Sequence, residues 1–276
     1  MSKYPVLLRG IEIDADNWGV SITETGSGTN TATIAAGTYY LRGDGSPGDF
    51  CAALKTALDN ASASTNTYTV TVTTNGTTAS WDTNPANVSA KVRISTGGPD
   101  TFKINWLHVN TTFDESLLGF AVEKGAADAN PEVSTKSPSS VWVSNDVHMD
   151  LIPGASWESQ STPLASGDTQ VIRRSSRSES RTLLLRKIDG RRLWLFSSPS
   201  DSSAALETFF NNVNNGVPIE LHEQSLLSSA VTTLSALSTS TRVRTSWRLD
   251  GANLSADREV LGLDLWNLDV FFFGVV

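Results

Sequence analysis

The stretch SSPSDSSAALETFFNNVNNGVPIELHE, residues 197–223, reads as a helix followed directly by a strand. Ser198 can cap a helix whose first position is Pro199, and Asp201 lies where negative charge favours the helix start. One apolar stripe then recurs at i, i+3, i+4 and i+7, made by Leu206, Phe209, Phe210 and Val213. We therefore predict a helix over 199–214 that packs on a sheet, followed by a strand whose Pro218 is typical of a sheet edge.

The composition is that of a β-rich protein with a packed core. The 276 residues are 39% hydrophobic and only 18% charged, and Ser, Thr, Asn and Gly replace much of the usual charge. The single cysteine, Cys51, excludes an intrachain disulfide and a thiolate metal cluster. The N-terminus lacks the apolar core of a signal peptide and no run is long enough to span a bilayer, so we expect a protein folded in a cytoplasm, with no membrane contact.

The charge is unevenly distributed along the chain. Residues 1–150 carry 9 Lys and Arg against 16 Asp and Glu, a net charge of −7, whereas residues 151–276 carry 12 against 13, a net charge of −1. The whole-chain charge of −8 argues against a nucleic-acid binder, because such a protein needs a basic face.

The first half predicts short strands around one helix. Strands in residues 1–25 flank a turn at Asp14–Asn17, and a strand–helix–multistrand module follows over 26–125. Its helix begins with Ser46 as the cap and Pro47 in the first position, with Asp49 near the positive end of the helix. Further alternating strands are predicted at 67–74, 90–96 and 101–106, with the last two joined as a hairpin by GGPD, and a short apolar turn at 114–123.

The second half predicts a larger β domain over 141–276, after a linker or surface loop at 126–140. Asp189–Gly190 is typical of a tight hairpin turn. The strands of this half are expected near 141–154, 168–174, 181–187, 191–197, 217–223, in the segment RVRTSWRLD and at the C-terminus. The fold class is therefore α+β and dominated by β-structure. Residues 225–240, rich in Ser, Thr and Leu, are read as a long loop or a β-arm.

No pattern in the sequence predicts a catalytic, cofactor-binding or metal-binding site. His108, His148 and His222 each alternate with apolar residues in predicted strands and have no metal-ligand spacing. Cys51 is expected to be a buried small hydrophobe. Paired carboxylates such as Asp14 and Asp16 fit solvated turns, and a cation site or a glycosidase pair is the alternative. We expect a protein that is not an enzyme and holds no cofactor.

The charge feature that stands out is a run of basic residues between 173 and 192. It is opposed only by Glu179 and Asp189, and it contains Arg173, Arg174, Arg177, Arg181, Arg186, Lys187, Arg191 and Arg192. A solvated hairpin edge, a nucleic-acid patch and a contact with an acidic partner all fit this run. The absence of interleaved aromatic residues disfavours nucleic acid. The acidic residues 1–150 of a neighbouring copy are an available partner.

Two patterns carry a resemblance to structural proteins of tailed-bacteriophage tails. The first is RTLLLRKIDGRRLWLFSSPSDSSAALETFFNNVNNGVPIELHE together with the closing LWNLDVFFF, which looks like the tail-tube-type β-sandwich or barrel with one flanking helix. The second is TIAAGTYYL, a helix, YTVTVT, VRIST, FKINW and ESLLGF, similar to a module that recurs in phage and viral structural proteins. The chain resembles distal tail or baseplate-hub proteins in particular.

The resemblance implies assembly without catalysis. Copies of such proteins form rings of three or six subunits around a channel through which DNA passes, in contact with tail-tube and baseplate or tail-tip proteins. The location implied is the tail of a virion, assembled in the cytoplasm of the host. Candidate residues for contacts between subunits are the arginines of the basic run and Leu226, Leu227 and Leu234 of the 225–240 segment.

Two other functions stay open at the level of sequence. A receptor- or glycan-binding module on a virion surface or tail tip would expose aromatic residues in a groove, and the candidates are Trp18, Trp81, Trp106 and Trp142. A hydrolase would need convergent carboxylates or a Ser–His pair in a cleft.

Overall fold

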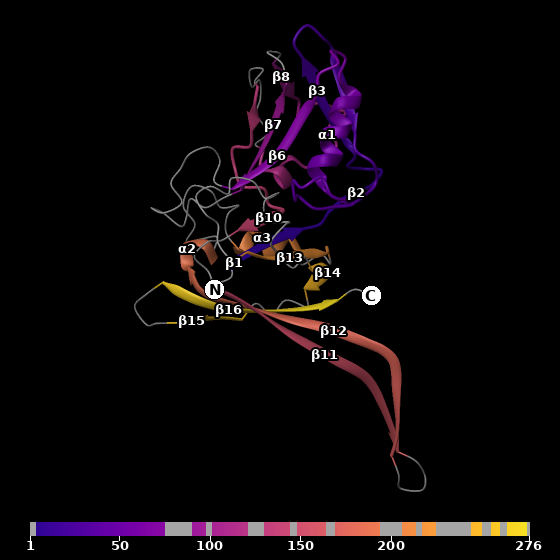
Figure 1. The fold of residues 1–276 in the computed structure, drawn as a ribbon, viewed down its shortest axis with the longest axis vertical. Helices are drawn as coiled ribbons and strands as arrows, with labels where there is room; N and C mark the ends of the chain where they lie inside the picture. Colours follow the sequence, from indigo (N-terminus) through magenta and orange to yellow (C-terminus); the bar gives the residue numbers. More distant parts are fainter. Residues whose placement is uncertain are drawn as a thin grey trace.

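The computed structural model describes residues 4–74, 90–97, 101–120, 130–143, 148–163, 169–193, 206–213, 217–224, 244–249, 255–259 and 264–274. Within these residues the chain forms a compact N-terminal module, a large sheet, and a long hairpin that projects from the sheet away from the module (Figure 1). None of the helices described is long and apolar enough to cross a membrane.

The N-terminal module contains three small antiparallel sheets and one helix. The sheets have the orders β2-β5, β4-β3-β8 and β6-β7-β9. The elements are β2 (Ile11–Ile13), β3 (Gly19–Glu24), β4 (Thr29–Thr33), β5 (Gly37–Tyr39), α1 (Phe50–Ala61), β6 (Tyr68–Thr74), β7 (Ala90–Thr96), β8 (Phe102–Ile104) and β9 (Glu132–Val133). The period-2 alternation of β7 buries Val92 and Ile94 and exposes Arg93, as a half-buried strand requires.

The predicted helix of the module is present, but it begins later than its Ser-Pro start suggested. Asp49 is the N-cap of α1, and its carboxylate accepts a hydrogen bond from the backbone N–H of Cys51. Ser46 and Pro47 belong to the preceding loop instead. Asp49 takes the cap because its carboxylate also receives the N–H groups of Gly43 and Gly45, which closes that loop onto the helix start.

The predicted hairpin across GGPD is wrong. β7 pairs with β6 and β9, whereas β8 pairs with β3, so the two strands belong to different sheets. The predicted turn at 114–123 contains a 3-10 helix, Glu115–Leu118, that ends at Gly119 in a left-handed conformation. Of the segment 126–140, expected to be a linker or surface loop, the described part is packed: β9 pairs with β7, and Ser134, Ser137 and Ser140 are buried.

The large sheet has eight antiparallel strands in the order β10-β1-β13-β14-β16-β12-β11, with β15 beside β16. Its strands are β1 (Tyr4–Arg9), β10 (Val141–Val143), β11 (His148–Pro163), β12 (Thr169–Asp189), β13 (Ile219–Gln224), β14 (Arg244–Leu249), β15 (Ser255–Arg258) and β16 (Leu265–Gly274). Strand β1 lies between β10 and β13. The N-terminal module is therefore inserted between two neighbouring strands of this sheet, and the β domain is incomplete without residues 4–9.

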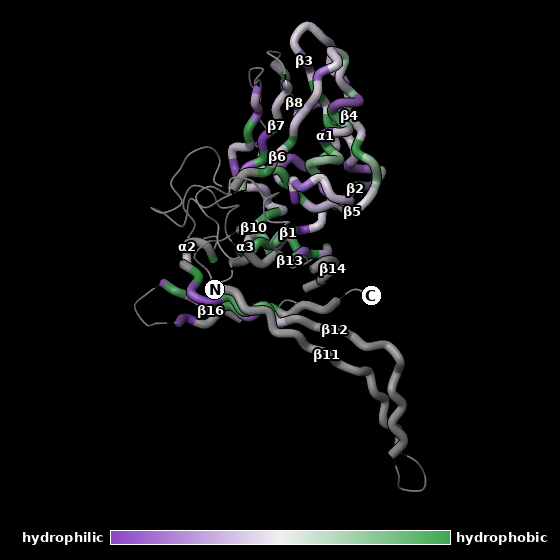
Figure 2. Tube along the Cα trace, viewed as in Figure 1, coloured by the Kyte–Doolittle hydropathy of each residue, from purple (hydrophilic) through white to green (hydrophobic). Residues whose placement is uncertain are grey.

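Strand β1 serves two hydrophobic cores at once. Val6 and Leu8 belong to the core of the N-terminal module, whereas Leu7 belongs to the core on the other face of the sheet. The neighbouring β10 alternates in the same way, with Val141 on the module side and Trp142 on the other. Figure 2 shows these hydrophobic strands at the junction of the two parts. Because both faces are covered, the strand reads as a continuous apolar run rather than an alternating one.

The second core is closed by α3 (Leu206–Val213), which confirms the helical stripe predicted there. All four residues of that stripe, Leu206, Phe209, Phe210 and Val213, are buried, and Phe209 and Phe210 contact each other edge to face. Burial of each Phe contributes about 2–3 kcal/mol from apolar area alone. The predicted start of this helix at Ser198–Asp201 lies outside the described residues.

The predicted hairpin turn at Asp189–Gly190 is wrong. β12 is a single 21-residue strand that runs through Asp189 and joins the strands expected near 168–174 and 181–187. Gly190 begins a short helix, α2 (Gly190–Leu193), where a new strand was expected. The ladder between β12 and β16 continues to the pair Asp189 and Leu265, so Asp189 is still part of a strand and does not lie in a turn.

The predicted β-dominated α+β class is confirmed, whereas a closed barrel is not formed by the residues described. β1 and β11 lie near each other in space, yet no ladder between them is described, so the sheet curls without closing. The 225–240 segment, with Leu226, Leu227 and Leu234, lies outside the described residues.

Candidate interaction surfaces

The hairpin of β11 and β12 extends well beyond the body of the protein. β12 pairs with β16 only from Ser180 to Asp189, while its pairing with β11 continues to Thr169. At about 3.3 Å per residue, the part of β12 beyond Ser180 is roughly 35 Å long. We call residues 155–163 and 169–179 the arm; Figure 1 shows these parts of β11 and β12 pointing away from the N-terminal module.

The arm is a two-stranded ribbon with open edges. Among the described residues, β11 pairs only with β12, and β12 has no second partner between Thr169 and Glu179. A hairpin of two strands is marginal by itself in water, and long unpaired edges are templates for pairing with other chains. The sequences ASWESQSTP and TQVIRRSSRSES contain few large apolar residues, so the pairing register is weakly specified by burial.

The structure distributes the predicted basic run over four settings. Arg173, Arg174 and Arg177 lie on β12 within the arm. On the facing strand β11 the register shifts between Trp157, which is opposite Arg177, and Ser159, which is opposite Arg173. Arg181 lies at the base of the arm, opposite Pro153 and Phe272. Arg191 and Arg192 lie in α2, away from the arm.

The remaining arginine of the run is part of the sheet. Arg186 forms an ion pair with Asp269 across to β16, and both side chains are partly exposed. Next to it, Lys187 is exposed and has a φ of 61°, at a register shift between Leu185 and Ile188. This bulge separates the regular ladder of β12 from the turn into α2.

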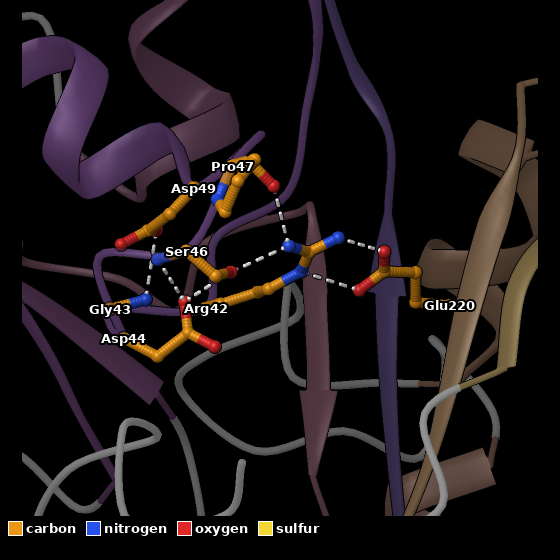
Figure 3. A network of polar contacts seen from close by, with 7 residues as sticks. All are labelled: Arg42, Gly43, Asp44, Ser46, Pro47, Asp49 and Glu220. Atoms are coloured by element: carbon orange, nitrogen blue, oxygen red, sulfur yellow. Dashed lines mark hydrogen bonds and ion pairs between the residues drawn. The ribbon is translucent and has the colours of Figure 1, made fainter.

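A buried ion pair joins the N-terminal module to the large sheet. Glu220 of β13 is 0% exposed and its carboxylate receives Nε and Nη2 of Arg42, whose side chain is 14% exposed (Figure 3). Glu220 is opposite Leu8 of β1, so it faces the module rather than the second core. The hydrogen bonds with Glu220 raise the pKa of Arg42, and burial followed by the Glu220 charge raises the pKa of Tyr40 to about 12.

The loop before α1 holds Arg42 in place. Nη1 of Arg42 donates to Ser46 Oγ at 2.8 Å and to the Pro47 carbonyl at 2.9 Å, and Ser46 Oγ donates in turn to Asp44 (Figure 3). All three guanidinium nitrogens therefore donate hydrogen bonds, and the position of Arg42 between the loop and Glu220 is fixed by their planar geometry.

A second buried carboxylate organises the module itself. Glu24 of β3 is 1% exposed and accepts hydrogen bonds from the segment that follows α1, donated by Ser62 Oγ, Ala63 N, Ser64 N, Asn66 Nδ2 and Tyr68 Oη. Burial alone would raise the pKa of Glu24, but these hydrogen bonds outweigh it and lower the pKa to about 2. Glu24 therefore fixes the end of α1 against β3 and β6.

An acidic patch lies on the surface of the module near β2. We define it as Glu12, Asp14, Asp16 and Asp114, all of which are exposed. Arg9 is half-buried near this patch: burial lowers its pKa, and the charges of Asp114 and Glu12 oppose that change. Strand β2 pairs only with β5 among the described residues, so its other edge is open beside the patch.

One Ser–His contact is present among the described residues, but its serine, Ser21, is 0% exposed. His108 lies in a turn rather than the predicted strand, where Nδ1 contacts Ser21 Oγ at 3.1 Å and receives the N–H of Asn110. Cys51 is buried in α1 as predicted, and burial raises the pKa of its thiol. Within the described residues there is no group of three His, Cys, Asp or Glu side chains placed to hold a metal ion.

The described tryptophans among the glycan-site candidates do not form an exposed platform. Trp106 is 9% exposed and packs beside Phe120, Trp142 is 2% exposed, and Trp18 is partly buried against the module core. Trp81 lies outside the described residues. Three of the four candidates for that groove are therefore buried or partly buried.

Sequence reasoning missed the features that shape these surfaces. The arm was divided into separate strands because SSRSES has a low strand propensity. The ion pair joins Arg42 to Glu220, 178 positions apart in the chain, and Glu220 between Ile219 and Leu221 reads as the solvent side of an alternating strand. A comparison of the chain with protein-family models, with curated proteins and with solved structures found no match in any of the three.

Proposed function

We propose that the protein is a structural component of a bacteriophage virion tail, of the distal tail or baseplate-hub type, whose copies assemble into a ring around a DNA channel. One observation carries the proposal: a two-stranded arm of roughly 35 Å leaves the body with both edges unpaired in the described structure. An arm of this kind gains stability when another chain completes its hydrogen bonds.

The body supports the same proposal. An antiparallel sheet with α3 against one face is compatible with the tail-tube-type fold that the sequence resembles. The inserted module is joined to that sheet by the Arg42–Glu220 pair and by the shared strand β1. In this role the partners are other copies, tail-tube proteins and baseplate or tail-tip proteins, and DNA only passes through the channel.

The test compares the full chain with a variant that lacks the arm. Register places Ala155 opposite Glu179, so residues 156–178 can be replaced by Asn-Gly, a two-residue turn that suits a hairpin. Size-exclusion chromatography with light scattering and negative-stain imaging are expected to show rings with a central hole for the full chain and monomers for the variant. A full chain that stays monomeric at high concentration would refute the proposed function.

A further inference from the structure

The outer edge of β12 in the arm has no partner in the chain. β16 occupies the position beside β12 up to Ser180, where it pairs through Phe273, and ends at Gly274. From Thr169 to Glu179 the position beside β12 is empty among the described residues. We call this stretch the open edge.

The open edge is basic. Arg173, Arg174 and Arg177 lie on it, and Arg181 follows at its base. The acids of the arm are fewer: Glu179 on the same stretch and Glu158 on the facing strand β11. Two such edges placed side by side would bring like charges together, which disfavours a contact between two arms. The open edge therefore suits an acidic partner.

The acidic patch of the N-terminal module meets that requirement. Glu12, Asp14, Asp16 and Asp114 are exposed there, and β2 offers an unpaired strand edge beside them. The arm points away from the module of its own chain, so it cannot reach its own patch (Figure 1). A second copy of the chain supplies the same patch in a reachable position.

We propose that the open edge of one copy docks on the acidic patch of the next copy. This inference rests on the proposed function, because it names the contact by which the copies assemble. The two surfaces differ, so the contact is head-to-tail, and repetition of it closes a ring or extends a fibre. Because the contact is between unlike charges and the patch is exposed, added salt weakens it.

Charge reversal tests the contact from both sides. Arg173→Glu/Arg177→Glu reverses the arm, and Glu12→Arg/Asp16→Arg reverses the patch without removing a hydrogen bond that the described structure assigns to either carboxylate. Each pair is expected to raise the dissociation constant of assembly at least tenfold, measured by light scattering. The fourfold variant with both reversals is expected to assemble again, because its charges are complementary once more.

A matched control changes the net charge without touching either surface. Arg93→Glu/Lys103→Glu replaces two positive charges on β7 and β8 by two negative ones, the same change in net charge as the arm reversal, and it is expected to assemble like the wild type. Circular dichroism checks that each variant is folded. The wild type gives a test that needs no variant: its dissociation constant must rise as NaCl is added.

The outcomes separate the two proposals. If the wild type assembles and the reversals change nothing, or if the fourfold variant does not recover, the docking contact is wrong while the proposed function stands. Assembly of the wild type that is indifferent to NaCl also contradicts the contact. If the wild type never assembles, the proposed function fails and this contact fails with it.

Discussion

Replacement of Glu24 by Gln is expected to destabilise the N-terminal module by about 3 kcal/mol at pH 7. The carboxylate has an ordinary pKa of 4.5 that the fold lowers to about 2, and each unit of such a shift corresponds to about 1.4 kcal/mol. Gln keeps the size of the side chain, but it loses the charge and turns an NH₂ group toward donors that need an acceptor.

The destabilisation must depend on pH in one direction. A lowered folded pKa gives stability that is complete above 4.5 and is lost as the pH falls from there through about 2. The difference in unfolding free energy between wild type and Glu24→Gln is therefore expected to shrink to about 1.4 kcal/mol at pH 3.

Urea denaturation followed by tryptophan fluorescence at pH 7 and at pH 3 measures this difference. Glu12→Gln is the control, since Glu12 is exposed on β2 and its replacement is expected to change stability by less than about 0.5 kcal/mol. A Glu24→Gln effect below about 1 kcal/mol at pH 7, or one that is the same at both pH values, would show that the hydrogen bonds to Glu24 do not stabilise the charged form.

Three further predictions concern positions in and beside the module. Gly119→Ala is expected to cost more than about 3 kcal/mol, because a Cβ there would lie 2.2 Å from the Lys136 carbonyl oxygen. Gly26→Ala, with the same φ of 77° and open space around it, is expected to cost about 1 kcal/mol. Equal shifts of the melting temperature for the two variants would rule out the clash. Glu220→Gln is expected to cost about 3–5 kcal/mol in urea denaturation because it leaves Arg42 half-paired in a buried joint, against less than about 0.5 kcal/mol for Lys55→Gln in a partly exposed pair. A small effect of Glu220→Gln would mean that the joint is not held by this pair. The Cys51 thiol, 2% exposed and with a raised pKa, is expected to resist a thiol reagent at pH 7 until urea unfolds the chain; rapid labelling of the native protein would contradict its burial.

Local signals in the sequence were sufficient for single elements. The apolar stripe of α3 and the alternation of β6 and β7 follow from periodicity alone, and the structure confirms them. The start of α1 was predicted at the Ser-Pro pair, and it lies at Asp49 because that carboxylate also binds the loop before it. When contacts with another segment decide which residue caps a helix, the local sequence pattern does not predict where the helix begins.

Pairing between distant strands could not be predicted from local patterns. The turn signals GGPD and Asp-Gly favoured hairpins, yet β8 joins β3, and β12 continues its ladder to Asp189. The insertion of the module between β1 and β10 depends on contacts across more than 130 residues, for which a single sequence gives no evidence. The same holds for the candidate surfaces. The sequence shows the basic run, but its placement on a projecting arm depends on strand pairing that the sequence does not predict.

Amide hydrogen exchange in the arm tests the architectural role most directly. If copies complete the open edges of β11 and β12, peptides from residues 155–163 and 169–179 must exchange more slowly in concentrated than in dilute protein, while peptides from α1 exchange equally in both. Arm amides that exchange at one rate over the whole concentration range would mean that no neighbouring copy pairs with them.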